Sequence, residues 1–341
     1  MFKEFYLMLR ELAIGCSPEN EDILIEEGFD RRTIKGLIRF TENEPGIQPE
    51  VLKRLLDPKF YQFENMLKIA KEGLYDIIPA YFFEDEEYLE KTGIDFLPYG
   101  FVAGDKKIKS FHLSEKIKKI ETKAFEGCSN LQTIELHEKL TYIGDKAFKG
   151  CHELNVTNLP ESLMYLGEEA FRDCRGIQEI SYPIGLYQIE DGVFKGCTNL
   201  ESFQAAGLKH ARDKCFEECY KLKKVDALFS HVGKECFSDC RSLKKVTLSQ
   251  CAIGKDAFRN CVSLEQVVYR FGFPGEIAKN AFPGCIRLNK VKIDGYEYQL
   301  KEMKGFYEFA RAFSSKPEIN GEPANKISAM SKIANVVLDI G

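Results

Sequence analysis

A nine-residue motif, Ile-Gly-x-x-Ala-Phe-x-x-Cys, recurs through the middle of this 341-residue chain and constrains its fold more than any other feature; one complete copy occupies residues 143–151. Its aromatic position recurs eight times, at intervals of 21–24 residues, as Phe125, Phe148, Phe171, Phe194, Phe216, Phe237, Phe258 and Phe282. A cysteine follows each phenylalanine by three residues: Cys128, Cys151, Cys174, Cys197, Cys219, Cys240, Cys261 and Cys285. Such a period predicts a solenoid of stacked coils that share one core.

The other positions of the repeat are also regular. An apolar residue precedes the phenylalanine, a small residue stands next to it, and a Leu-x-x-Ile-x-Leu segment follows the cysteine, although the second unit slips by one residue at Val156. The period-two end of that segment predicts one short strand per unit, and parallel neighbours about 4.7–4.9 Å apart predict one parallel sheet. We expect the Phe, Cys and Leu positions to form buried columns. The glycines before the phenylalanine, Gly144, Gly167, Gly233 and Gly254, are expected to allow a tight turn.

Four cysteines in the later repeats raise the question of a zinc site. Cys215, Cys219, Cys236 and Cys240 have a C-x3-C…C-x3-C spacing. However, Cys219 and Cys240 belong to the regular column, while Cys215 and Cys236 replace the small residue, so we predict buried, reduced thiols. Cys251 lies outside the columns and is expected to be partly exposed. The sequence shows no phosphate-binding or hydrolase motif, and we predict no metal, no cofactor and no catalytic residue.

The segments that flank the repeats lack the motif. Apolar residues at helical spacing predict a helical N-terminal domain over residues 1–100, including a stripe at Phe60, Phe63, Leu67 and Ala70, and the repeats are assigned to residues 101–295. Residues 296–341 are predicted to cap the solenoid with a helix over residues 296–313, a linker and a last helix over residues 324–340. The acidic run Glu84–Glu87 is interpreted as a solvated helix face, with a divalent cation site as the alternative.

The charge distribution and the absence of a recognisable membrane span or secretion signal in this sequence predict the protein's partners and its location. Residues 1–100 hold 21 acidic and 12 basic residues, a net charge of −9, which argues against nucleic acid as the partner of that part. No apolar run approaches the roughly 18 residues of a membrane span, and the first residues lack the pattern of a secretion signal. We therefore expect a cytoplasmic protein that does not bind membranes. The alternative is a cell-surface or secreted protein exported without such a signal.

The repeat resembles the BspA-type leucine-rich repeat. Residues 159–174, which read LPESLMYLGEEAFRDC, match that repeat almost throughout, and the resemblance covers residues 105–295. It implies an α/β repeat solenoid, right-handed and curved, with a parallel sheet on one face. It also implies binding of other proteins without catalysis, commonly at a bacterial cell surface.

Together these features predict a non-enzymatic scaffold that presents the sheet face of its solenoid to a protein partner. The outward strand positions carry basic residues in the later repeats, which suggests an acidic partner; ordinary solvated lysines are the alternative. The predicted partner-binding residues are Lys224, Lys245, Lys290, Lys292, Glu135, Glu179, Tyr182 and Tyr269. Two rival functions stay open: an adhesin or delivered effector that binds host protein, and an enzyme whose repeats act as a targeting module.

Overall fold

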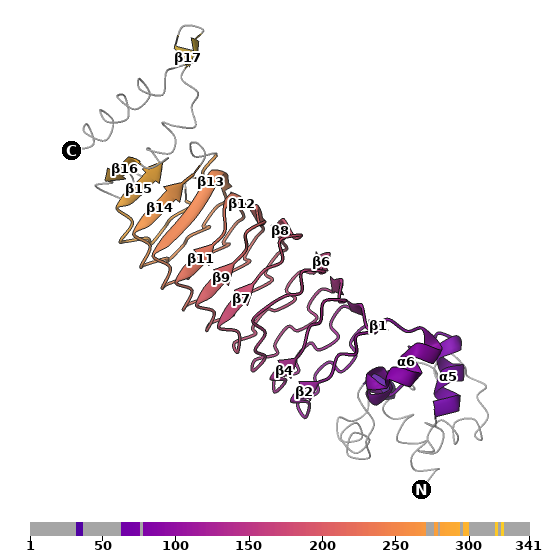
Figure 1. The fold of residues 1–341 in the computed structure, drawn as a ribbon. Helices are drawn as coiled ribbons and strands as arrows, with labels where there is room; N and C mark the ends of the chain where they lie inside the picture. Colours follow the sequence, from indigo (N-terminus) through magenta and orange to yellow (C-terminus); the bar gives the residue numbers. More distant parts are fainter. Residues whose placement is uncertain are drawn as a thin grey trace.

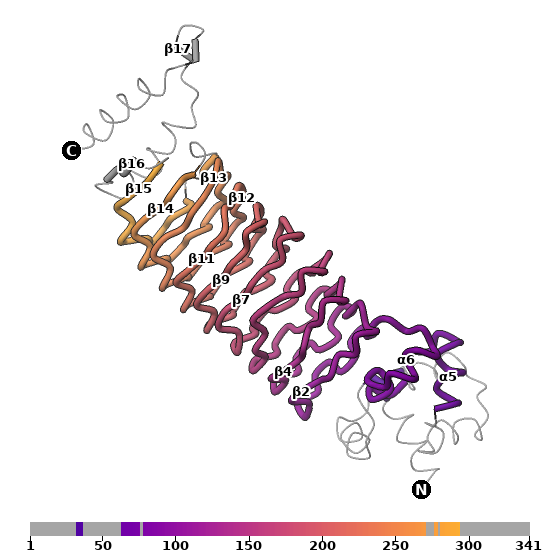
Figure 2. The backbone as a smooth tube through the Cα atoms, in the orientation of Figure 1, coloured from indigo at the N-terminus to yellow at the C-terminus, as the bar shows by residue number. Residues whose placement is uncertain are grey.

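The computed structural model describes residues 32–36, 63–75, 78–270, 276–278 and 280–293, and the backbone of three further short strands. These residues form an elongated solenoid with helical elements at its N-terminal end (Figure 1). The backbone winds through successive coils that stack along the long axis (Figure 2). Of the helices predicted before residue 60, only residues 32–36 are described, and they are helical, whereas the helix predicted after residue 323 lies outside the described residues.

Most coils contribute two strands where the sequence predicted one. The Leu-side strands follow the leucine position: β2 (Ser110–Phe111), β4 (Thr133–Ile134), β7 (Glu179–Ser181), β9 (Ser202–Gln204), β11 (Lys224–Asp226), β14 (Gln266–Tyr269) and β15 (Lys290–Ile293). The Phe-side strands precede the phenylalanine: β1 (Phe96–Leu97), β3 (Lys119–Ile120), β5 (Tyr142–Ile143), β6 (Tyr165–Leu166), β8 (Gln188–Ile189), β10 (His210–Ala211) and β12 (Phe229–Val232). The long strand β13 (Lys245–Ile253) runs through both rows. The two rows follow the two long sides of the solenoid (Figure 1).

Neighbouring strands within each row pair in parallel, as predicted, but the single continuous sheet that we expected is wrong. The Phe-side row divides into β1-β3-β5-β6 and a second sheet that begins at β8. The Leu-side row is interrupted between β4 and β7, where the slipped second unit forms only an isolated bridge between Asn158 and Ser181, and again between β11 and β13, which contact each other without pairing. The strand β1 pairs with β3, so the solenoid begins at Phe96, inside the range predicted for the helical domain.

The predicted columns of the core are confirmed. All eight phenylalanines of the motif are buried, and their rings stack on one another with centroids 4.8–5.9 Å apart and planes within 15° of parallel. The column cysteines and leucines are buried beside them. Each column thiol donates a hydrogen bond of 3.0–3.2 Å to a carbonyl oxygen of the preceding coil. From Cys151 onward that carbonyl belongs to a motif phenylalanine, so ring and thiol connect the same two coils.

The turn that carries the phenylalanine uses left-handed backbone at two positions, before the small residue and before the cysteine. Glycine fills some of these positions, but among the described residues ten that are not glycine also have positive φ, including Lys146 at 58° and Glu169 at 53°. In this conformation alternate N–H groups point at the next coil: those of Lys146, Phe148 and Gly150 each donate a 2.8 Å bond to one of its carbonyl oxygens. The strained conformation therefore produces a third set of bonds between coils.

The four motif glycines have a different role from the tight turn that we expected, because none of them has positive φ. A Cβ atom on Gly144 would lie 2.5 Å from the backbone nitrogen of Thr122 in the preceding coil. Where glycine holds this position, successive phenylalanine rings are 5.1–5.2 Å apart. Where Glu190 and Arg212 hold it, the spacing widens to 5.9 and 5.8 Å. The exception is Ala278, whose coil stacks at 4.8 Å.

The described helical elements cover the first coil. They are the helical residues 32–36, α5 (Phe63–Lys71), the 3-10 helix η3 (Ala80–Glu84) and α6 (Glu86–Thr92). The helix predicted around Phe63 is thus confirmed, whereas a helical domain over all of residues 1–100 is not supported. Arg32 is buried between the rings of Phe83 and Phe101 and donates to the carbonyl oxygens of Phe101, Tyr75 and Ile78. This guanidinium joins residues 32–36 to the helical cover and to the first coil.

The acidic run has a capping role at α6. The Asp85 carboxylate accepts a 2.9 Å bond from the N–H of Tyr88, and Glu86 and Glu87 lie in the first helical turn. Carboxylates stabilise a helix at this end because of its dipole.

At the other end, the predicted helix over residues 296–313 is wrong at its start. Tyr296–Gln299 forms β16, which pairs antiparallel with β15 and covers that edge of the sheet. Two-residue strands β17 (Glu318–Ile319) and β18 (Glu322–Pro323) form a hairpin in the predicted linker. The predicted C-terminal helical cap is therefore not supported.

The glycine contact can be tested with Gly144→Ala. The new methyl group collides with the backbone of residues 121 and 122, so we expect destabilisation of about 1–3 kcal/mol and a lower urea midpoint. Gly185→Ala is the matched control, because its Cβ would meet no atom within 4 Å. Equal midpoints for the two variants would contradict the close-contact explanation.

Candidate functional site: the outward faces of the strand rows

The Leu-side strands place the predicted lysines on one face. Lys224 and Lys245 are the exposed first residues of β11 and β13, two strands that contact each other. On β15, Lys290 aligns with Gln266 and Lys292 with Val268 of β14, and both lysines are half-buried. Neither Lys224 nor Lys245 forms an ion pair with any residue that the structure describes, whereas the adjacent Lys223 lies 2.8 Å from Glu201.

The predicted acidic positions lie further toward the N-terminal end. Glu179 is the exposed first residue of β7, and exposed Glu135 directly follows β4. The interruption of the Leu-side row between β4 and β7 separates these two residues. The outward face therefore changes from acidic in its early coils to basic in its later coils.

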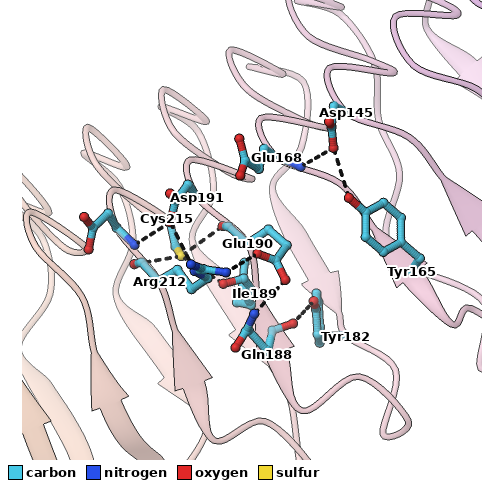
Figure 3. Close-up of polar contacts among 11 residues, drawn as sticks. Asp145, Tyr165, Glu168, Tyr182, Gln188, Ile189, Glu190, Asp191, Arg212 and Cys215 are labelled. Atoms are coloured by element: carbon cyan, nitrogen blue, oxygen red, sulfur yellow. Dashed lines mark hydrogen bonds and ion pairs between the residues drawn. The ribbon is translucent and has the colours of Figure 1, made fainter.

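Two of the predicted partner-binding residues, Tyr182 and Tyr269, are buried. Tyr182 is 4% exposed and packs against Phe203, and its hydroxyl donates a 2.7 Å bond to the carbonyl oxygen of Gln188 (Figure 3). Tyr269 is fully buried on β14. Both residues replace core leucines or isoleucines, and their rings remain in the core, so they are not available to a partner.

The Phe-side strands carry an aromatic surface that sequence reasoning missed. Tyr142 and Tyr165 pair in register on β5 and β6, and their rings stack at 4.8 Å. The Tyr165 hydroxyl donates a 3.2 Å bond to the Asp145 carboxylate (Figure 3). Met164, directly before Tyr165 in the same coil, is 78% exposed, and Tyr187, at the equivalent position of the next coil, is 63% exposed. We name Tyr142, Met164, Tyr165 and Tyr187 the tyrosine surface. Tyr142 and Tyr165 directly precede the apolar residue of their unit, and Met164 and Tyr187 stand two residues before it.

A polar groove of about 360 Å³ lies where Gly192 leaves out a side chain that neighbouring coils possess. Its acidic residues connect the turns of successive coils. The Asp191 carboxylate accepts a 3.0 Å hydrogen bond from the backbone N–H of Asp213, and the Asp213 carboxylate accepts a 2.7 Å hydrogen bond from the backbone N–H of Lys234. Lysines and an arginine line the same groove. The two charge types compensate each other, so the groove does not select an ion of one sign.

The described cysteines are core residues. All eleven are free and buried, including Cys251, whose predicted partial exposure is wrong because the unbroken strand β13 points it inward. Burial raises the pKa of Cys128 and of Cys251 to about 12, and it raises the pKa of Cys174, Cys215 and Cys219 well above the ordinary value. These thiols are therefore neutral hydrogen-bond donors rather than nucleophiles. Within the described ranges, no group of three or more His, Cys, Asp or Glu side chains is arranged to hold a metal.

The stacked parallel coils and their repeated leucine position define a leucine-rich-repeat solenoid. The family model described as "BspA type Leucine rich repeat region" matches in six copies, over residues 98–223, 169–289 and 210–310. These matches span well over half of the chain, which therefore belongs to the BspA-type leucine-rich repeat family. The predicted family is thus confirmed.

Similar solved structures come from bacteria. A leucine-rich repeat protein of Bacteroides ovatus is 23% identical, with 59% of this chain and 64% of that chain covered and a TM-score of 0.42. The leucine-rich repeat protein of T. pallidum is 27% identical over 44% of this chain and 72% of that chain, with a TM-score of 0.41. A leucine-rich cell-surface protein of Faecalibacterium prausnitzii is 17% identical over 60% and 77% of the two chains, with a TM-score of 0.33.

This chain thus spans a little under two thirds of the Bacteroides ovatus protein. Comparison with curated proteins finds no match. Among the helices that the structure describes, none has the length and apolar character needed to cross a membrane.

The buried thiols predict a loss of stability in alkali. Unfolded cysteines lose their protons near pH 8.5, whereas the buried thiols, with raised pKa values, stay protonated. Their stabilising contribution is therefore complete below pH 8.5 and falls above it, by about 1.4 kcal/mol per pH unit for each such thiol. Urea midpoints measured between pH 7.5 and 9.5 should fall steeply above pH 8.5.

A double variant provides the control for this prediction. Cys215→Ala with Cys236→Ala introduces the alanine that other repeats have at this position, so the fold tolerates it and two titrating thiols disappear. The alkaline slope should become shallower by about two protons. A wild-type midpoint that stays constant up to pH 9.5 would show that the thiols do not govern alkaline stability.

Proposed function

We propose that the chain is a non-catalytic scaffold that binds an acidic protein through the basic later part of its Leu-side face. The observation that carries this proposal is the pair Lys224 and Lys245, exposed on contacting strands and unpaired with any described carboxylate. Membership of the repeat family supports a protein-interaction role in general.

The charge arrangement favours a negatively charged partner that lies over the later strands of the Leu-side row. Ammonium groups on contacting strands repel one another, and carboxylates of a partner relieve this repulsion. Lys290 and Lys292 on β15 extend the basic face toward the C-terminal end, and Glu179 and Glu135 lie beyond its other end. We propose that the acidic segment of the partner lies across β11, β13, β14 and β15. The partner's location stays open between the cytoplasm and the cell surface.

The proposal can be tested by charge reversal. The double variant Lys224→Glu with Lys245→Glu should lower the affinity for the acidic partner protein at least tenfold at physiological salt, because two attractive contacts become repulsive. Lys119→Glu is the matched control, since Lys119 is an exposed, outward lysine on β3 of the Phe-side row. Binding measured by surface plasmon resonance should also weaken as salt increases.

The tyrosine surface gives the decisive comparison. Met164→Ser with Tyr187→Ser removes exposed apolar contact from the Phe-side row and leaves the lysines intact. If this variant loses the partner and the lysine variant retains it, the binding face proposed here is wrong.

A further inference from the structure

Two histidines occupy adjacent strands of the Phe-side row at the same register. His210 on β10 aligns with His231 on β12, and their ring centroids are 6.2 Å apart with planes at 42°. His231 is exposed and His210 is half-buried. The parallel ladder fixes the spacing of the two side chains, because both strands are bonded into the same sheet.

The ring nitrogens of this pair are available. Among the described residues, neither His210 nor His231 engages a ring nitrogen in a hydrogen bond, whereas His137 uses both of its nitrogens, with Ser114 and Lys139. The Tyr187 ring packs edge-on against His210 at 6.2 Å and orients that imidazole from the opposite side. The strand residue beyond His231 is Ala252, whose small side chain leaves the solvent side open.

The surrounding charges are largely compensated. Arg212, two residues after His210, lies 3.0 Å from a Glu190 oxygen and 3.6 Å from an Asp191 oxygen, and Figure 3 shows its contact with Glu190. The amide of Gln188, the strand residue before His210 in the row, donates to Glu190. The guanidinium is therefore held by carboxylates beside the pair rather than directed at the imidazoles.

We propose that His210 and His231 form a two-histidine site for a divalent transition-metal ion such as Zn²⁺ or Cu²⁺. Neutral imidazole is a preferred ligand of both ions. A metal midway between the rings would be about 3 Å from each centroid, which suits metal–nitrogen bonds of about 2.0–2.1 Å once the rings rotate. The remaining coordination positions face solvent, where water or a side chain of a bound protein completes them. This inference is independent of the lysine face, which lies on the other strand row.

The test is metal titration of the full-length protein. Zn²⁺ alone, followed by isothermal titration calorimetry at pH 7.5, should show one site that weakens at least tenfold in His210→Ala and in His231→Ala. His152→Ala is the matched control, since His152 is exposed and lies in a turn outside the described strands. Circular dichroism melts establish that each variant is folded.

Electron paramagnetic resonance of the Cu²⁺ complex identifies the ligands directly. The wild-type spectrum should show coupling to two imidazole nitrogens, and each single variant should retain one. Zn²⁺ affinity that does not change in either variant, or a Cu²⁺ spectrum with fewer than two imidazoles, would overturn the proposal.

Discussion

Contact between successive coils at about 5 Å holds this solenoid together. Stacked phenylalanine rings, the thiol bond to a carbonyl of the preceding coil and the bonds of the left-handed turn all act across the same interval. A left-handed non-glycine residue costs about 1–2 kcal/mol. The turns with a non-glycine residue at these positions tolerate this cost because their N–H groups would otherwise be buried without acceptors.

Differences in repeat length are accommodated outside this contact. Two segments keep the same number of residues in the 21- and 24-residue units. One runs from the phenylalanine to the Leu-side apolar residue, and the other runs from the Phe-side apolar residue to the next phenylalanine. The length of the link between the strand rows changes instead: the link is Val246–Ile253 in a 21-residue unit and Val267–Ile277 in the 24-residue unit. The link is equally short from Val225 to Val232, where β11 and β12 stay separate, and from Val246 to Ile253, where β13 runs unbroken through both rows. Length variation is therefore confined to this link and leaves the ring stack intact.

The sequence correctly predicted the positions that recur in every repeat, but it did not predict the features that depend on contacts between coils. The Phe, Cys and Leu columns were correct because burial selects the same residue types in each coil. The second strand row was missed because each coil usually contributes only two residues to it, too few for visible alternation. Tyr182 and Tyr269 are predicted to contact a partner, yet they stand where other units have leucine or isoleucine, and the structure buries them in the core. The tyrosine surface and the histidine pair arise from register between coils, which one repeat read alone does not show.

The contact between successive coils also determines which positions of the repeat can vary to form binding surfaces. Inward positions serve the stack, and the turn positions serve bonds between coils, so the outward strand residues are the ones free to differ from coil to coil. They differ in blocks: Tyr142 and Tyr165 in one pair of coils, His210 and His231 in another, and Lys224 and Lys245 on the opposite row. Adjacent coils place equal residues about 5 Å apart, so a short run of like residues becomes a surface of one chemical character. A solenoid built this way can present several distinct surfaces without any change to its core.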